Sequence, residues 1–496
     1  MTPDLINWHE RSQSLRIETR AYIDGAYVDA LSGQTFECIN PATGLPIASI
    51  ASCDAADVER AVKSARRAFE GGDWSRAAPL ERKKVLQRFS TLILEHREEL
   101  ALLESLNVGK PITNAFNGDI ASSAATIQWY AEAIDKVYGE VAQSGHDMTT
   151  MVIREALGVV AAVVPWNYPL SMACWKLGPA LATGNSVILK PAEQSPLTAI
   201  RIASLATEAG IPKGVLNVLP GFGETAGKAL GLHMDVDAVA FTGSTAVGKL
   251  FMQYAGQSNI KRVGLECGGK SPHIVLADCQ DLDAAARSVA AGIFSNAGQV
   301  CNAGSRLIVD KSVSKALLDR VVEHAANLKP GDPLDPATRL GAIVSQRQLS
   351  TVMSYVQTGQ AEGARLLAGG ERALQESGGY FMSPTVFADV SRDMRIAQEE
   401  IFGPVLSAIT VSGIDEAIEV ANASNYGLAA GVWTDNVKSA LHASRMLRAG
   451  VVWVNCFDRG SMAAPFGGFK QSGFGRDKSL HAFDKYTDWK SIWMAH

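Results

Sequence analysis

Valine-rich apolar runs alternate with helix-like segments through the middle of this 496-residue chain. The first run, Val159–Val164, is uninterrupted, and helical periodicity follows it over Met172–Thr183. Strands and helices are then expected in turn at Ser186–Leu189, Ser195–Ala209, Val215–Leu219, Thr225–Leu230 and Ala238–Phe241. Continuous apolar strands separated by helices are typical of a parallel sheet with both faces covered. The pattern therefore predicts an α/β fold.

A second alternation of the same kind begins after Glu266. Its expected strands and helices are Ile274–Leu276, Leu282–Phe294, Leu307–Val309, Val313–Leu328, Asp415–Asn422, Leu428–Thr434, Val437–Leu447 and Val451–Asn455. Helices are also expected before the first alternation, over Asp54–Phe69, Leu80–Leu106 and Ser122–Lys136. A chain of this length exceeds one ordinary core, so we expect two α/β domains that meet between Val263 and Gly269.

Composition excludes several classes of protein. The net charge is −5 and the basic residues are dispersed, which provides no footprint for nucleic acid. The polar first twenty residues contain no apolar signal core, and the run at Val159 is too short to span a membrane. Seven dispersed cysteines suit a reducing cytoplasm, and no spacing of histidines and cysteines predicts a metal site.

Cys301 lies between glycines in the segment Asn296-Ala-Gly-Gln-Val-Cys301-Asn-Ala-Gly. Glycines let the backbone approach a ligand closely, so both the thiol and the Cys301 N–H could face a reacting carbonyl. By itself, each of the seven cysteines is best interpreted as a small buried apolar residue. Other chemistry-bearing segments strengthen the case: they read PWNYP from Pro165, LECGGK from Leu265, EEIFGP from Glu399 and PFGG from Pro465.

This set resembles the aldehyde dehydrogenase superfamily over roughly Phe36 to Trp493, with matches that also include KLGPALATGNSVILKPAE, FTGST and PFGGFKQSG. The subsegments WYAEAIDKVYGEV and FKQSGFGRDKSLHA are most similar to bacterial enzymes for γ-glutamyl-aminobutyraldehyde, guanidinobutyraldehyde and indole-acetaldehyde. The resemblance implies a Rossmann-like NAD-binding domain, an α/β catalytic domain and a small β oligomerisation arm. Their expected ranges are 1–137 with 155–265, 266–475, and 138–154 with 476–496. A homodimer or homotetramer is implied.

For catalysis, the resemblance implies that the Cys301 thiolate attacks the aldehyde carbon. The Asn167 amide and the Cys301 N–H are expected to hold the oxyanion, and Glu266 is expected to be the general base that hydrolyses the thioester. Lys176 is expected to contribute to the electrostatics of the nucleophile.

For the cofactor, the resemblance implies NAD. Lys190 and Glu193 are expected at the adenosine ribose, where a carboxylate would repel a 2′-phosphate and so favour NAD over NADP. The other implied cofactor contacts are Trp166, Gly223, Gly243, Ser244, Glu400 and Phe402. The run Gly243-Ser-Thr-Ala-Val-Gly-Lys-Leu250 also resembles a phosphate loop, but Leu250 stands where Ser or Thr must bind Mg²⁺, so an ATPase is excluded.

The sequence departs from the family at three places. Cys267 replaces a common leucine beside Glu266, Ala297 stands where a larger polar residue is usual, and Ser461 replaces an aspartate found in relatives that act on aminoaldehydes. The expected substrate wall is largely apolar and consists of Trp129, Met172, Trp175, Phe294, Cys456 and Phe466. It leaves three substrate classes open: ω-amino or guanidino aldehydes, aromatic aldehydes such as indole-acetaldehyde, and medium-chain aldehydes.

Three other functions remain in competition. A CoA-acylating relative would not need Glu266, and a cofactor-free cysteine esterase would not need Lys190 or Glu193. A binding protein that kept only the scaffold would not need Cys301 and Asn167.

Overall fold

The run at Val159 forms β7 (Val159–Val163), at the centre of an eight-stranded sheet in the computed structural model, which describes residues 3–496. The strand order is β2-β1-β9-β8-β7-β10-β11-β23. The other strands are β1 (Ala21–Ile23), β2 (Ala26–Val28), β8 (Ser186–Lys190), β9 (Leu216–Val218), β10 (Ala238–Thr242), β11 (Arg262–Glu266) and β23 (Gly473–Phe474). The five strands from β9 to β11 are parallel; β7, β8, β9 and β10 match predicted strands, whereas β11 was not predicted.

Helices cover both faces of this first sheet. Val160 and Ala162 of β7 belong to one core, and Val159 and Ala161 belong to another on the opposite face. The helices of the first core are α3 (Pro79–Glu95), α4 (Arg97–Val108), α6 (Ala121–Ala133), α7 (Pro169–Ala182) and α8 (Leu197–Ala209). Those of the second are α2 (Ala55–Gly71), α9 (Lys228–Leu232) and α10 (Thr245–Gln257).

The chain reverses its direction across the sheet beside β7. From β7 it proceeds outward to β8 and β9, then returns to place β10 and β11 on the other side. At such a switch point the loops after neighbouring strands separate and leave a crevice for a ligand. The loops after β7, β10 and β11 therefore face one crevice.

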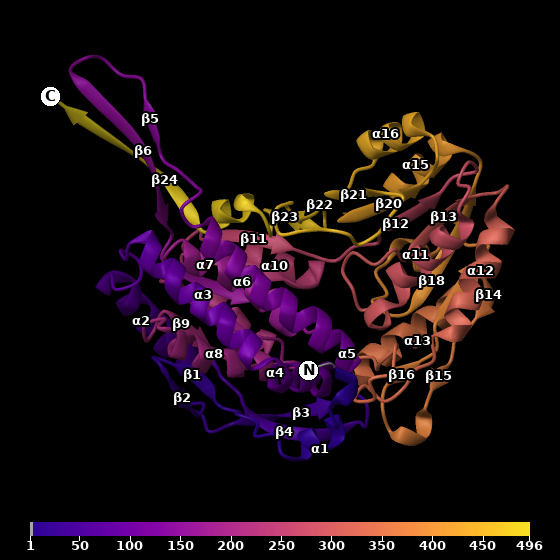
Figure 1. Cartoon of the computed structure of the whole chain (residues 1–496), viewed down its shortest axis with the longest axis horizontal. Coiled ribbons are helices and arrows are strands. Elements are labelled where there is room, and N and C mark those ends of the chain that lie inside the picture. The colour runs from indigo at the N-terminus through magenta and orange to yellow at the C-terminus, as the bar shows by residue number, and fades with distance from the viewer. Residues whose placement is uncertain (1–2) are drawn as a thin grey trace.

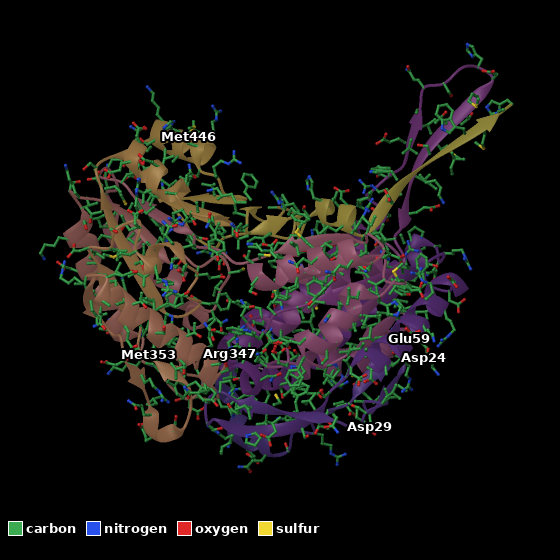
Figure 2. The ribbon with its side chains drawn as sticks, turned by 180° about the vertical axis from the view of Figure 1, so that it is seen from behind. Asp24, Asp29, Glu59, Arg347, Met353 and Met446 are labelled. Carbon is green, nitrogen blue, oxygen red and sulfur yellow. The ribbon has the colours of Figure 1, made fainter. Side chains whose placement is uncertain are left out.

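A second sheet has seven strands in the order β14-β17-β18-β13-β12-β20-β21. They are β12 (Pro272–Val275), β13 (Arg306–Asp310), β14 (Arg365–Ala368), β17 (Thr385–Ala388), β18 (Val405–Val411), β20 (Ala429–Trp433) and β21 (Val451–Val454). Its helices are α11 (Leu282–Phe294), α12 (Ser314–Asn327), α13 (Gln346–Ala361), α15 (Ile414–Asn422) and α16 (Val437–Met446). Figure 1 shows the two sheets side by side. Figure 2 labels Glu59 and Asp24 in the part of the molecule built on the first sheet, and Met353 and Met446 in the part built on the second.

A three-stranded sheet projects from the body and carries the C-terminus at its tip (Figure 1). It consists of β5 (Glu140–Ala142), β6 (Met148–Ala156) and β24 (Thr487–Ala495). The register runs from Thr487 opposite Ala156 to Ala495 opposite Met148. The C-terminal segment of the expected oligomerisation arm thus contains a strand, and this strand pairs with β6 of its own chain.

Several local expectations need correction. The helix expected over Leu80–Leu106 is two helices, α3 and α4, which meet at His96. The short helix expected over Thr225–Leu230 is a π turn, η3 (Gly223–Gly227), followed by α9. Helices α10 and α13, strands β11, β14, β17 and β18, and the hairpin of β3 (Thr35–Asn40) with β4 (Leu45–Ala51) were not predicted. No helix within residues 3–496 is long and apolar enough to cross a membrane.

Candidate active site

A cleft of about 540 Å³ lies where loops of the first sheet meet segments of the second. Three of the four predicted catalytic residues line it, namely Cys301, Glu266 and Asn167. So do five of the predicted cofactor contacts and three of the substrate contacts: Trp166, Gly243, Ser244, Glu400, Phe402, Met172, Trp175 and Phe466. The predicted residues that do not line it are Lys176, Lys190, Glu193, Gly223, Trp129, Phe294 and Cys456.

A left-handed turn carries Cys301 into the cleft. After α11 ends at Phe294, the residues Asn296, Ala297 and Gly298 have φ values of 48°, 53° and 71°. A Cβ on Gly298 would collide with the Gly403 carbonyl, so this position requires glycine. Non-glycine residues in this region of backbone space are strained and cluster at functional sites. Burial raises the pKa of the Cys301 thiol, and the carboxyl groups of Glu266 and Glu400 raise it further.

Hydrogen bonds join the Asn167 side chain to the nucleophile turn. Asn167 Nδ2 donates to the Gln299 carbonyl at 2.9 Å, and Asn296 Nδ2 donates to the Asn167 carbonyl at 3.0 Å. The Gln299 side chain in turn accepts from Val344 N at 2.9 Å. An amide has two N–H donors, so Asn167 keeps one for a ligand in the cleft while the other fixes its orientation.

Glu266 is the last residue of β11, where the parallel strand ends at the cleft. Its side chain is buried, and Oε1 has no hydrogen-bond partner among the described residues. Burial raises its pKa to about 8; Asp477 raises it as well, whereas Lys176 and Lys485 lower it. A carboxyl group with such a pKa becomes able to accept a proton from water as the pH rises toward about 8.

Lys176 lies behind the cleft in a buried ion cluster. Its Nζ is 2.5 Å from Asp477 Oδ2, and Lys485 pairs with Oδ1 of the same aspartate. We name Lys176, Asp477 and Lys485 the Asp477 cluster. Lys176 thus acts on Glu266 through the field of this cluster, since it does not line the cleft.

Glu400 is held at the junction of the two sheets. Its Oε1 accepts from Gly269 N at 3.0 Å, and a Cβ on Gly268 would collide with its carboxylate. Burial raises the pKa of Glu400 to about 7, although the Gly269 N–H and Lys270 lower it. The Gly-Gly pair after Glu266 therefore makes room for a second carboxylate in the same cleft.

Phe402 and Trp166 form the wall beside Glu400. Their rings meet edge to face, with centroids 5.1 Å apart and planes at 89°. Phe402 has a φ of 57°, and Gln348 Nε2 donates to its carbonyl at 3.0 Å. Ser244 lines the same cleft and caps α10 by accepting from Val247 N at 3.3 Å, so the N-terminus of this helix opens into the cleft.

Lys190 is the last residue of β8 and Glu193 follows that strand, whose neighbour β7 leads to Trp166 and Asn167. Lys190 is buried, and its Nζ donates to the Pro191 carbonyl at 2.9 Å. Burial lowers its pKa, although Glu193 nearby raises it. Gly223 begins the π turn η3, and Gly227 at the end of that turn packs against Lys190. These residues lie at the same sheet edge as the cleft but beyond its lining.

The structure divides the predicted substrate wall. Met172, Trp175 and Phe466 line the cleft, and the last two rings meet with centroids 5.4 Å apart. Trp129 packs against the core of the first sheet and Phe294 is buried in the core beside α12. Cys456 is partly buried outside the cleft lining. We therefore keep only Met172, Trp175 and Phe466 as proposed substrate contacts.

Sequence reasoning missed several residues of the cleft. Asp119, Met462 and Lys478 all line it. Lys478 directly follows the aspartate of the Asp477 cluster, but nothing in its local sequence indicates that it faces Cys301. No group of three or more His, Cys, Asp or Glu side chains within residues 3–496 is arranged to hold a metal ion.

Known proteins resemble this chain over its whole length. A model described as the aldehyde dehydrogenase family matches residues 27–492. The NADP/NAD-dependent aldehyde dehydrogenase PuuC of Escherichia coli K12 is 51% identical over 491 residues, which cover 99% of this chain and 98% of that protein.

Two solved structures extend the comparison. The indole-3-acetaldehyde dehydrogenase AldA of P. syringae, solved in complex with NAD+ and IAA, is 59% identical and has a TM-score of 0.98. The γ-glutamyl-γ-aminobutyraldehyde dehydrogenase of Burkholderia cenocepacia is 55% identical and has a TM-score of 0.97. Each covers 100% of both chains. The predicted fold class is confirmed.

Proposed function

The chain belongs to the aldehyde dehydrogenase family, and we propose that its NAD-dependent oxidation of an aldehyde to an acid proceeds through a thioester on Cys301. One observation carries the proposal: Cys301, Asn167 and Glu266 come from three separate elements and line one cleft. A nucleophile, an oxyanion donor and a base are the three groups that acyl transfer requires.

In the first half-reaction, the Cys301 thiolate adds to the aldehyde carbon and forms a thiohemiacetal. The free N–H of Asn167 and the Cys301 backbone N–H stabilise its oxyanion; one such donor contributes about 2.7–4 kcal/mol. When bound, NAD supplies the acceptor for the hydride whose loss turns the thiohemiacetal into a thioester.

In the second half-reaction, Glu266 removes a proton from water as the water adds to the thioester carbon. The tetrahedral adduct then expels the Cys301 thiolate and releases the carboxylic acid. The presence of Glu266 in the cleft favours hydrolysis of the thioester over transfer of the acyl group to CoA, because transfer to a thiolate does not need a base that activates water.

The residues around Glu400 fit NAD. The Glu400 carboxylate, which the small Gly268 and Gly269 admit to the cleft, can accept from ribose hydroxyls. The N-terminus of α10 at Ser244 suits a pyrophosphate. We propose that Lys190 and Glu193 bind the adenosine ribose, and that the charge of Glu193 favours NAD over NADP.

For the substrate, the cleft offers an apolar wall and two carboxyl groups. Met172, Trp175 and Phe466 form the wall, and Asp119 and Asp458 line the same space. We propose an ω-amino or guanidino aldehyde, an aromatic aldehyde such as indole-acetaldehyde, or a medium-chain aldehyde. The carboxyl groups support the first class, although Ser461 lacks the acid that relatives acting on aminoaldehydes carry.

Two further proposals concern the setting of the enzyme. We propose a homodimer or homotetramer, supported by Trp489, Trp493 and Met494, which are large exposed side chains on the projecting β24. We propose that it acts in the cytoplasm, supported by its seven cysteines, all of which are free. The division into NAD-binding, catalytic and oligomerisation segments also stays a proposal. It is supported by β11, the last parallel strand of the first sheet, and β12, the first strand along the chain of the second sheet, which lie on either side of the expected junction.

The test is NADH release over a panel of aldehydes without CoA. The panel contains aminobutyraldehydes, guanidinobutyraldehyde, indole-acetaldehyde, benzaldehyde, octanal and succinic semialdehyde, each with NAD and with NADP. We expect acid formation with NAD by the native enzyme and none by C301A. A strict requirement for CoA, or turnover by C301A, would contradict the proposal. Ester cleavage that persists while NAD fails to shift the melting temperature would favour the cofactor-free esterase instead.

A further inference from the structure

The cleft is rich in carboxyl groups and contains one basic side chain. Among the described residues that line it, Asp119, Glu266, Glu400 and Asp458 are acidic, and Lys478 is the single lysine, arginine or histidine. Carboxylates close to a thiol disfavour the thiolate, the form that attacks an aldehyde. The position of the one cation therefore matters for the chemistry of Cys301.

The backbone around Lys478 is fixed on both sides. Asp477 N donates to the Phe466 carbonyl at 2.7 Å, Phe466 N donates to the Asp477 carbonyl at 2.8 Å, and Ser479 N donates to the Met462 carbonyl at 2.7 Å. Lys478 itself has a φ of 58°, in the left-handed region that a lysine rarely adopts. Such a conformation persists only where surrounding contacts impose it.

Aromatic rings hold the ammonium group in the cleft. Nζ lies 4.4 Å from the centroid of Trp175 and 5.3 Å from that of Phe466. Within residues 3–496, this ammonium has no hydrogen-bond or ion-pair partner, whereas Lys176 and Lys485 are both paired with Asp477. Rings stabilise a cation without neutralising its charge, so its field remains available to the cleft.

The groups that feel this charge include the nucleophile. Burial lowers the pKa of Lys478, whereas the charges of Asp458 and Cys301 raise it, followed by those of Asp477 and Glu266. The ionisable groups whose charges couple to that of Cys301 are Glu266, Glu400, Asp458, Tyr168 and Lys478, and all five line the cleft together with the thiol. Of these, only Lys478 carries a positive charge.

We propose that Lys478 is the cation that stabilises the thiolate of Cys301. It acts through Cys301 and does not touch the reacting carbon, so it is a positioning residue. The inference rests on Cys301 as the proposed nucleophile. Besides contacting the substrate, the Trp175 and Phe466 rings then also hold this ammonium group in place.

The test follows the alkylation of Cys301 by iodoacetamide, a neutral reagent, in the full-length protein without NAD. Peptide mass spectrometry resolves Cys301 from the other cysteines, and rates are taken from about pH 6 to about pH 10. K478M keeps the length of the side chain and removes the charge, K478R keeps the charge, and K315M is a matched control on the exposed face of α12.

We expect the rate near neutral pH to fall about tenfold in K478M, which corresponds to one pH unit in the thiolate profile. K478R should retain the native profile and K315M should not change it. The proposal is overturned if K478M folds natively, by circular dichroism and melting temperature, and keeps the native profile. It is also overturned if K478R loses as much as K478M. Turnover by C301A would instead refute the proposed function, a result that the alkylation profile does not depend on.

Discussion

The Asp477 cluster holds one carboxylate between two lysines, whereas a second buried cluster holds two carboxylates around one lysine. The second, which we name the Glu104 cluster, consists of Glu104, Lys110 and Asp119. Lys110 pairs with Asp119, lies 4.0 Å from Glu104 Oε1 and sits 3.7 Å from the centroid of the Tyr168 ring. The two clusters thus have opposite charge ratios, and Asp119 of the Glu104 cluster lines the cleft.

The charge ratio of each cluster is reflected in the pKa values of its carboxyl groups. Although burial raises the pKa of Asp477, its two lysines bring it below the usual value. Burial raises the pKa of Glu104 to about 8, and the charge of Asp119 raises it as well. The surplus of cations keeps Asp477 ionised beside Glu266, and the shortage of cations leaves Glu104 protonated at neutral pH. Similar burial therefore gives opposite protonation because the number of partners differs.

The first prediction compares the effects of E266Q and E104Q on kcat. Both glutamates are buried and both have a pKa of about 8, but only Glu266 lines the cleft. We expect E266Q to lower kcat about 10²–10⁴-fold, the usual contribution of a general base. E104Q should leave kcat within about twofold, because a buried amide replaces a carboxyl group that is already neutral. Steady-state NADH release decides, and equal losses in the two variants would remove the distinction.

The second prediction concerns the stability of a variant in which the Asp477 cluster has lost its carboxylate. D477N leaves Lys176 and Lys485 buried without their carboxylate, which typically costs about 3–5 kcal/mol. D119N is the matched control, because removing the Asp119 charge, which raises the pKa of Glu104, lets Glu104 ionise and pair with Lys110; we expect a loss of about 1–2 kcal/mol. The shift of the urea unfolding midpoint measures both. If D119N proved as destabilising as D477N, the number of partners would not explain the difference.

Neither cluster could be predicted from the sequence. Lys176 and Asp477 are 301 residues apart, and the local sequence around each of them does not indicate that they pair. By contrast, Asn167 and Glu266 could be located from the short motifs around them, which resemble those of the family, and both lie at the carboxyl ends of parallel strands that meet at one sheet edge. Periodicity of apolar residues predicts strands and their ends, whereas ion pairs depend on tertiary contacts.

The predicted substrate wall also shows what apolar periodicity cannot predict. Trp129, Phe294 and Phe466 are equally apolar, and periodicity alone does not separate a core position from a cleft position. Only Phe466 lies in a loop that faces the cleft, whereas Phe294 ends a helix and is buried against its neighbours. Strands β17 and β18 were missed because the segment between them was interpreted only as a motif around Glu400.

The third prediction uses pH to separate the functions of the two glutamates. A raised pKa of about 8 means that Glu266 becomes a base only as the pH rises through that value. Where hydrolysis limits turnover, kcat should therefore rise about tenfold per pH unit below the pKa and reach a plateau above it. E104Q should show the native profile and E266Q should lose the rise. A native kcat that stays constant over this range would contradict the assignment of Glu266 as the base.

The smallest expected effect concerns the stability of E104Q. The pKa of Glu104 is raised from 4.5 to about 8, so the folded state holds its proton more tightly than the unfolded state between these values. Stability from this group is therefore fully present below about pH 4.5 and is lost as the pH rises through about 8. E104Q removes this dependence, while Glu266 contributes equally to both proteins and cancels in the difference. We expect E104Q to be less stable than the native enzyme by about 1 kcal/mol near pH 5 and at least as stable near pH 9, as measured by urea unfolding. A difference that stays constant with pH would show that Glu104 is ionised, and that the Glu104 cluster does not differ from the Asp477 cluster in the way its charge ratio implies.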